Sequence, residues 1–403
     1  MILRAIYQSP ALRAAVVFGL GGVAFTVGNL ILARVLAPRE YGLLSLVIGV
    51  VTVAGLCAPM GLDFAVARRG LTLGPQLRRT ALASSAIVGL ATVVISAALY
   101  HLPVDLLLAI FVATVGMGTL QAVAAHFQGQ RQFGLAMPFA QVSSWALLLV
   151  GIVAWVLRET TATGPSALVA ISMTATAAVG WFMLAQRTRR HDRSPLPAGL
   201  WGEALSLVTI NLAGALLLQL ERLIIPMTIG IKELALFGVA TALVGWPFRM
   251  MQSAVNFTVV PRLRDAGSVA ARRHLLWREL LIFSVVVVPV TLLIWLLAPP
   301  ITRWFLGDRY DLSTSIVLAM IISGLLKVLS AFGTSVVSAL APDRGLWLLS
   351  TFSWLCIVVS IGLAFAFRPY GLCGAVYAVS VGWFLRTCIA LSISAPHLRL
   401  DDR

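Results

Sequence analysis

The residues LLIFSVVVVPVTLLIWLLA, at positions 280–298, contain no charged side chain. A helix of about 20 apolar residues is long enough to cross roughly 30 Å of hydrocarbon. The stretch does not alternate between apolar and polar residues, as the strands of a membrane barrel do. Lipid offers no partners for backbone N–H and C=O groups, so a helix that satisfies its own hydrogen bonds is the expected form. The stretch therefore predicts a transmembrane helix.

The rest of the chain repeats this pattern. Of its 403 residues, 60% are hydrophobic and only 11% are charged, and a water-soluble core cannot bury so much apolar surface. The sequence predicts an all-α integral membrane protein with about twelve transmembrane helices. We expect them near residues 14–36, 41–60, 81–99, 104–124, 137–156, 167–184, 204–229, 235–259, 280–297, 312–338, 346–367 and 371–394.

The connectors between these predicted spans carry Lys and Arg unevenly. Of the 30 such residues, nineteen lie at the two termini and on alternate connectors, eight lie on the opposite side, and three lie inside spans. Short loops rich in Lys and Arg stay in the cytosol. We therefore expect a multi-pass protein of the cell inner membrane with cytosolic N- and C-termini. The net charge of +15 then reflects topology, and no nucleic-acid partner is expected.

The sequence also predicts a division into two halves. We expect an N-terminal six-helix bundle over 1–190, a basic cytosolic linker over 191–203, and a C-terminal six-helix bundle over 204–403. A weak repeat supports this division, because YGLLSLVIG at 41–49 aligns with FGVATALVG at 237–245. Halves related by an axis along the membrane normal place a binding site between them, which points to alternating access.

Charged side chains inside spans are costly, so each one is a candidate functional residue. Arg249, Gln252 and Asn256 are spaced to share one face of the eighth predicted helix. Lys327 lies in a stripe of hydroxyl residues on the tenth. This face and this stripe are candidates for substrate contacts.

Two further groups lie towards the outer ends of the first and seventh predicted helices. Asn29 precedes Arg34 on the first, and Glu221 precedes Arg222 on the seventh. Two simpler interpretations stay open: Arg222 pairs only with Glu221, and the hydroxyl stripes only hold helices together. Arg386 is close enough to a cytosolic end to extend its charge towards water.

The excess charge inside the spans is cationic. A cavity lined by Arg and Lys favours an anion, and phosphate is a natural candidate. We therefore expect substrate contacts from Arg34, Arg222, Arg249 and Lys327, with hydrogen bonds from Asn29, Gln252 and Asn256. Glu221 is a candidate for ion coupling or for an ion pair.

No feature of the sequence indicates a metal site, a cofactor or a catalytic centre. The five histidines are scattered, and the four cysteines all lie in predicted spans without metal-ligand spacing. No phosphate-binding loop or nucleophile motif is present. We expect a protein that is not an enzyme.

The stretch LGGVAFTVGNLILARVLAPREYGLLSLVIGVVTVAGLCAPMGLDFAVARRG, at 20–70, resembles the opening of polysaccharide-export flippases. These include the flippases of O-antigen and other lipid-linked oligosaccharides, and they belong to the multidrug/oligosaccharidyl-lipid/polysaccharide (MOP) superfamily. LQLERLIIPMTIGIKELALFGVATAL, in the second half, is similar to the seventh and eighth helices of that family. The chain departs from the pattern at Leu236, where the second copy would carry an acid.

The resemblance implies two six-helix bundles in a V around a cationic cavity that opens alternately to each side. The implied cargo is a polyprenyl-pyrophosphate-linked glycan, with a polysaccharide polymerase and glycosyltransferases as possible partners. A drug/cation antiporter of the same superfamily is an alternative, disfavoured because no first-half span carries a carboxylate near its centre. Two further alternatives are a lipid II flippase and a membrane-embedded glycosyltransferase or ligase. The first is disfavoured because such a flippase usually has two more helices, and the second because it needs a larger outer loop.

Overall fold

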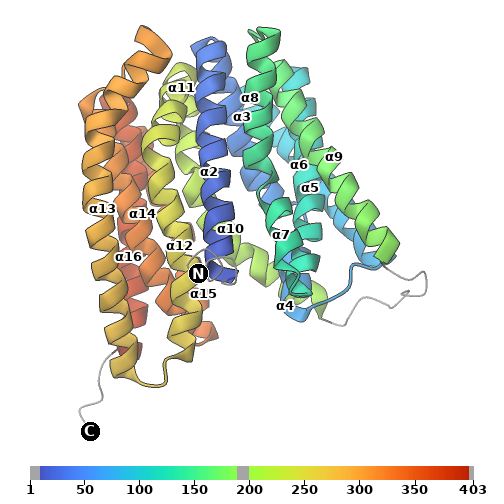
Figure 1. Ribbon diagram of the computed structural model, residues 1–403, viewed down its shortest axis with the longest axis vertical. Helices are drawn as coiled ribbons and strands as arrows, with labels where there is room; N and C mark the ends of the chain where they lie inside the picture. The colour runs from blue at the N-terminus through green and yellow to red at the C-terminus, as the bar shows by residue number, and fades with distance from the viewer. Residues whose placement is uncertain (1–9, 188–198, 399–403) are drawn as a thin grey trace, which may run out of the picture. The chain divides into compact units, whose positions relative to one another are not determined.

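The computed structural model describes residues 10–187 and 199–398. Every regular element within these two ranges is a helix, as Figure 1 shows. The predicted all-α fold is therefore confirmed. The expected linker at 191–203 falls largely outside the described residues.

The helices up to residue 187 follow the predicted spans, with two additional short elements. α4 follows α3 after a tight turn, and α7 precedes α8 at a bend of 51°. The bounds are α2 (Pro10–Val35), α3 (Pro38–Cys57), α4 (Leu62–Arg69), α5 (Pro75–Tyr100), α6 (Val104–Gly129), α7 (Phe133–Ala140), α8 (Val142–Leu157) and α9 (Thr163–Arg187).

The helices after residue 199 include one irregular span, in which a π-helical turn joins α11 to α12. The bounds are α10 (Leu200–Thr228), α11 (Ile231–Ala240), η1 (Thr241–Gly245), α12 (Trp246–Asp265), α13 (Val269–Leu306), η2 (Gly307–Arg309), α14 (Thr314–Leu340), α15 (Asp343–Ala366), η3 (Arg368–Tyr370) and α16 (Gly371–Leu398).

All twelve expected spans are helical. Ten helical segments are long and apolar enough to cross a membrane, and the bent pair α7–α8 makes eleven. The remaining expected span is α2, of which Gly19–Val35 counts as a shorter apolar helix. α13 shows its lipid-facing character most clearly, because only 11% of its apolar window is buried. These helices make the chain a multi-pass membrane protein.

Contacts between helices divide the described chain into two compact units. The first comprises Val16–Ala235 and the second contains Leu236 onward. α10 packs on α3 and α4, so it lies in the first unit by contact, although the predicted halves assign it to the second. The predicted division into two six-helix bundles, which the weak repeat supports, stays a prediction.

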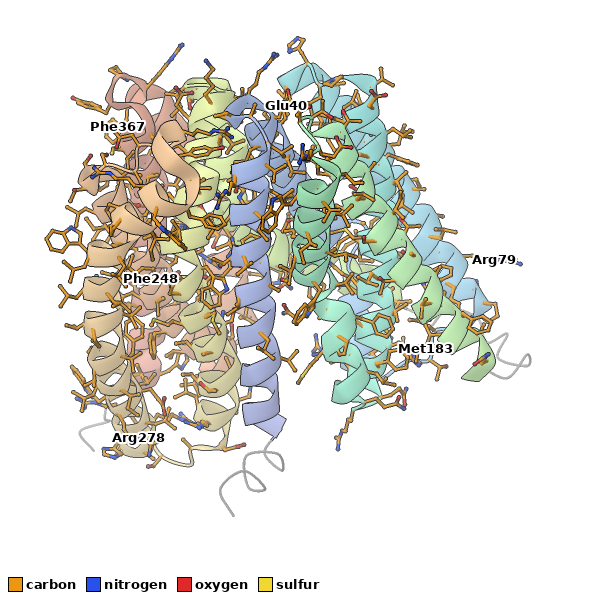
Figure 2. All side chains as sticks on the ribbon, turned by 45° about the horizontal axis from the view of Figure 1, so that its top comes forward. Glu40, Arg79, Met183, Phe248, Arg278 and Phe367 are labelled. Carbon is orange, nitrogen blue, oxygen red and sulfur yellow. The ribbon has the colours of Figure 1, made fainter. Side chains whose placement is uncertain are left out.

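The first unit is organised around α6, which packs on α3, α4, α5, α7 and α9. An apolar cluster fills the space between α4, α6 and the beginning of α10, with members such as Val66, Val123 and Leu200. Glycines allow close approach here: a Cβ on Gly42 would meet the carbonyl oxygen of Ile231 at the start of α11, and one on Gly61 would meet that of Ala204 on α10. Figure 2 places Glu40 and Arg79 at opposite ends of this unit's helices.

The second unit is organised around α14, which packs on α12 and α16, while α15 packs on α16. α14 is largely buried, whereas α13 exposes a row of large apolar side chains. Leu281, Val285, Val288 and Leu292 belong to that row, with exposed fractions of 65%, 67%, 65% and 54%. Such an apolar surface is stable against lipid tails and would be a liability in water. Figure 2 shows Arg278 and Phe367 at opposite ends of this unit.

Candidate functional site

Two of the predicted ionisable residues lie deep inside the first unit, on α10. Glu221 is 1% exposed and Arg222 is 3% exposed. Almost two turns of α10 separate them from the connector at Ile229 and Gly230. A charge in such a position has lost its hydration, so the surrounding helices must hold it in place.

Two neighbouring helices hold the Arg222 side chain. A Cβ built on Gly49 of α3 would lie 3.1 Å from Arg222 Cβ and 3.3 Å from its Cδ, so the absence of a side chain at Gly49 makes room for the arginine. The guanidinium carbon lies 5.8 Å from the centre of the Phe25 ring on α2, within the range of a cation–π interaction. The structure thus fixes both the stem and the charged end of Arg222.

Asn29 lies one turn beyond Phe25 on α2 and is 2% exposed. Its Nδ2 donates to the Phe25 carbonyl oxygen at 2.8 Å, and its Oδ1 accepts from the Tyr41 hydroxyl at 3.3 Å. The amide therefore links α2 to α3 next to Arg222. Arg34, nearer the end of α2, is exposed, and its charge suits the last turn of the helix.

The other predicted residues lie in the second unit. Arg249 and Gln252 on α12 and Lys327 on α14 are half-buried, and Asn256 is exposed. Asn256 Oδ1 accepts a hydrogen bond from Ser335 Oγ of α14 at 3.3 Å. Because α12 packs on α14, the two predicted cations of this unit lie on neighbouring helices.

The position of Arg249 depends on an irregularity that the sequence reading missed. The π-helical turn Thr241–Gly245 ends directly before Trp246 and Pro247. Proline has no N–H to donate and clashes with the preceding turn, so it disrupts a regular helix. One residue further on, Phe248 is 1% exposed, and its ring occupies the space that a side chain at Gly324 of α14 would need. Figure 2 labels Phe248.

Arg386 lies midway along α16 and is held by a neighbouring helix. Its Nε donates to Ser353 Oγ of α15 at 3.0 Å, and its guanidinium carbon lies 5.4 Å from the centre of the Trp383 ring. Extension of this side chain towards the cytosol, the simpler interpretation, is not the conformation in the structure.

A mostly apolar cavity of about 550 Å³ lies in the first unit beside α2, the α7–α8 bend and α9. Trp145, Pro138 and Leu149 are among its lining residues, and none of the predicted cations is. Among the described residues, no three His, Cys, Asp or Glu side chains come together as a metal site would require.

The sequence reading missed the residues that position the predicted ones. Phe25 and Phe248 are ordinary aromatic residues of membrane helices and carry no recognisable signal, whereas Tyr41 begins the weak repeat at 41–49. Gly49 had a signal, since it is one of the glycines of the weak repeat, but its partner Arg222 could not be identified from that repeat.

A family model described as polysaccharide biosynthesis protein matches residues 31–315, which is well over half of the chain. The chain belongs to this family. None of the curated protein sequences matches it. The family membership and the fold described below confirm the resemblance that the motifs at 20–70 and in the second half predicted.

Several solved structures share the fold at low identity. An inward-facing multidrug resistance MATE family transporter of the MOP superfamily is 15% identical with a TM-score of 0.67, covering 95% of this chain and 98% of that one. The lipid II flippase MurJ, in an inward closed conformation, is 11% identical with a TM-score of 0.65, covering 94% and 87%. The eukaryotic MATE transporter AtDTX14 is 15% identical with a TM-score of 0.60, covering 97% and 96%. The fold is that of MOP-superfamily transporters.

Proposed function

We propose that this protein flips a polyprenyl-pyrophosphate-linked oligosaccharide across the cytoplasmic membrane, by alternating access, for the synthesis of a cell-surface polysaccharide. The family supports the polysaccharide context, and the fold is shared by transporters and by a flippase of a lipid-linked substrate. In this proposal the protein is not an enzyme. Glycosyltransferases would assemble the saccharide before flipping, and a polymerase would act on it afterwards.

The observation that carries the proposal is the sign of the charge inside the spans. Three cationic side chains, Arg249, Lys327 and Arg386, lie inside the predicted spans. A fourth, Arg222, is buried towards the end of α10 beside the carboxylate Glu221. Hydrocarbon makes an excess of one sign costly, so such residues are retained where they serve a pathway. A pyrophosphate supplies the compensating charge and accepts several hydrogen bonds from Arg and Lys.

We propose roles for the individual residues on this basis. Arg249 and Lys327 of the second unit bind the pyrophosphate, with Gln252 and Asn256 hydrogen-bonding phosphate or sugar oxygens. In the first unit, Arg222 and Arg34 provide the corresponding cations and Asn29 a hydrogen-bonding amide. Glu221 balances Arg222 or couples an ion to the cycle.

Two alternatives are favoured by particular observations. A drug/cation antiporter is one alternative, because the inward-facing structure that shares this fold is a multidrug resistance transporter of the MATE family. A cation carrier needs a buried carboxylate to bind its cargo, and the cationic excess argues against that chemistry. Lipid II is the cargo of MurJ, and its pyrophosphate would suit the same cationic residues.

The test is flipping of a fluorescent polyprenyl-pyrophosphate-linked saccharide in vesicles that contain the purified protein. We expect Arg249→Ala and Lys327→Ala each to lower the flipping rate at least tenfold, because each removes a charge-assisted contact worth about 1.5–3 kcal/mol. Arg249→Lys should keep more activity than Arg249→Ala if charge dominates. Arg273→Ala, an exposed arginine on α13, is the matched control and should flip normally.

Three outcomes separate the alternatives. Normal flipping by both alanine variants would exclude the cationic contacts proposed here. Transport of a cationic drug in place of the lipid-linked saccharide would favour the antiporter. Flipping of lipid II alone would keep the mechanism and change the cargo.

A further inference from the structure

Asp63 is a buried carboxyl group to which the proposed flipping mechanism assigns no role. It is the second residue of α4 and is 6% exposed. Its Oδ1 is fully buried and has no hydrogen-bond partner among the described residues. An ionised carboxylate with an unsatisfied oxygen is costly in such a place, whereas the neutral acid is tolerated much better.

The turn before Asp63 fixes it in this position. Met60 and Gly61 have φ values of 48° and 80°, so the chain reverses tightly between α3 and α4. Gly61 lies directly against the carbonyl oxygen of Ala204 on α10. Leu62, Ala65 and Val66 form the buried face of α4 together with Asp63. The carboxyl group therefore lies under a short helix that is docked on α6 and α10.

Ionisable groups on the elements around α4 are engaged elsewhere. Arg69 Nε donates to Glu203 Oε2 of α10 at 2.6 Å, and Arg68 pairs with the same carboxylate at 3.6 Å. No basic side chain forms an ion pair with Asp63 in the part of the chain that the structure describes. Among the described residues, the ionisable groups at this end are Cys57 of α3, Arg68 and Arg69 of α4, Arg78 and Arg79 of α5, His126 of α6, Arg131 after α6, Arg187 of α9 and Glu203 of α10.

Two more of these groups, His126 and Arg78, form hydrogen bonds with the connector between α4 and α5. His126 Nδ1 accepts from the Leu73 N–H at 3.3 Å, and Arg78 Nε donates to the Leu73 carbonyl oxygen at 2.8 Å. The Cys57 thiol is close enough for the Asp63 charge to act on it electrostatically. Within residues 10–187 and 199–398, no cation forms an ion pair that offsets the burial of Asp63.

We propose that Asp63 is a proton-binding site whose protonation holds α4 docked against α6 and α10, and whose ionisation releases α4 towards water. The proton is the ligand, and the docked helix is the element that responds. The proposal concerns the first unit alone and does not depend on the cargo. If α4 moves during transport, the same site provides a point at which a proton can be linked to the cycle.

The direction of the pH dependence follows from burial. Burial raises the pKa of Asp63 from its ordinary value of 3.8 to about 7, although the backbone N–H of Phe64 lowers it in part. A carboxyl group whose pKa is higher in the docked state than in the released state favours docking at low pH. The docking equilibrium weakens about tenfold per pH unit as the pH rises between the two values and is constant above the upper one.

The experiment uses the full chain in lipid nanodiscs with a spin label on α4. The four native cysteines are replaced by alanine, and the label is attached at Ala67→Cys, which is half-buried on α4. We expect the mobile fraction of the label to rise between pH 5 and pH 7 and to level off above, as docking weakens by about 100-fold. A label at Arg79→Cys, exposed on α5, reports any change that is not specific to α4.

Two variants identify the titrating group. Asp63→Asn mimics the protonated acid and should keep the α4 label immobile from pH 5 to pH 8.5. Glu203→Gln removes the ion pair with Arg68 and Arg69 and should loosen α4 at every pH while leaving the pH dependence in place. A wild-type label that does not respond to pH, a response that survives Asp63→Asn, or one that disappears in Glu203→Gln would each overturn the proposal.

A second measurement needs no variant at position 63. Dicyclohexylcarbodiimide reacts with protonated carboxyl groups in apolar surroundings, and mass spectrometry locates the adduct. We expect modification of Asp63 in the wild-type protein at pH 6 to exceed that at pH 8 several-fold. Equal modification at both pH values, or none, would show that Asp63 does not bind a proton in this range.

Discussion

At the scale of single residues, the space left by Gly49 decides where the Arg222 side chain lies. The stem of the arginine passes the bare Cα of Gly49, and its charged end lies over Phe25. A side chain at position 49 must therefore move Arg222, and with it the charge that the proposed mechanism places near the outer end of α10.

We predict that Gly49→Val abolishes flipping to the same extent as Arg222→Ala and lowers the free energy of unfolding by about 1–3 kcal/mol, the usual cost of overpacking. Flipping in vesicles and thermal unfolding in detergent check the two effects. Gly362→Ala is the matched control, since nothing lies within 4 Å of the position where its Cβ would be. A Gly49→Val protein that flips at the wild-type rate would show that Arg222 needs no fixed position.

The residue scale also shows how far the sequence alone can go. An arginine within an apolar helix is visible in any sequence, so Arg222, Arg249 and Lys327 could be singled out directly. Their surroundings could not, because Phe25 and Gly49 reach Arg222 only when α2, α3 and α10 pack together. Phe25 and Arg222 are separated by almost 200 residues, and no local sequence pattern links residues so far apart.

At the scale of helices, the break between α11 and α12 is the main departure from a regular span. The π-helical turn at Thr241–Gly245 accommodates Pro247 without leaving the span. Such turns contain one residue more than a regular helix needs, and they occur frequently at functional sites. Here the turn lies directly before the segment that carries Arg249 and Gln252.

We predict that Pro247→Ala makes the span more regular, raises the free energy of unfolding by about 1 kcal/mol and lowers the flipping rate. An alanine restores the missing N–H and removes the clash of the proline ring. A regular helix would also change the rotational position of Arg249. Thermal unfolding and vesicle flipping measure the two effects, and a variant that is less stable but fully active would contradict both.

The helices show where sequence patterns succeed and where they fail. Apolar length alone located the ten long spans and the bent pair α7–α8, because the hydrocarbon thickness imposes it. It could not show that α4 is a separate helix or that the fifth span bends between α7 and α8. Pro138 lies in α7, shortly before that bend, so a local signal existed there, but its effect on direction depends on the packing of neighbouring helices.

At the scale of the whole molecule, the division into two compact units changes the interpretation of Arg34 and Arg222. The predicted halves assign Arg34 to the N-terminal bundle and Arg222 to the C-terminal bundle. Both lie in the unit Val16–Ala235, since α10 packs along α3 and α4. The two arginines therefore belong to one unit, and the predicted cations of the other unit are Arg249 and Lys327.

Topology is the whole-molecule property that charge placement predicts most directly. Arg79 and Glu40 lie at opposite ends of the first unit, and Arg278 and Phe367 lie at opposite ends of the second (Figure 2). The basic ends, with Arg79 and Arg278, are the ones that short Lys- and Arg-rich loops predict to be cytosolic. Each unit thus offers an independent test of the same orientation.

We predict that Gln76→Cys and Arg273→Cys react with a membrane-impermeant maleimide only after the cells are permeabilised, whereas Thr160→Cys and Asp311→Cys react in intact cells. All four positions are exposed, and the native cysteines are replaced by alanine so that each label reports one site. Reaction of the first pair in intact cells would invert the orientation. Opposite results for the two units would show that the basic loops do not set the topology of both.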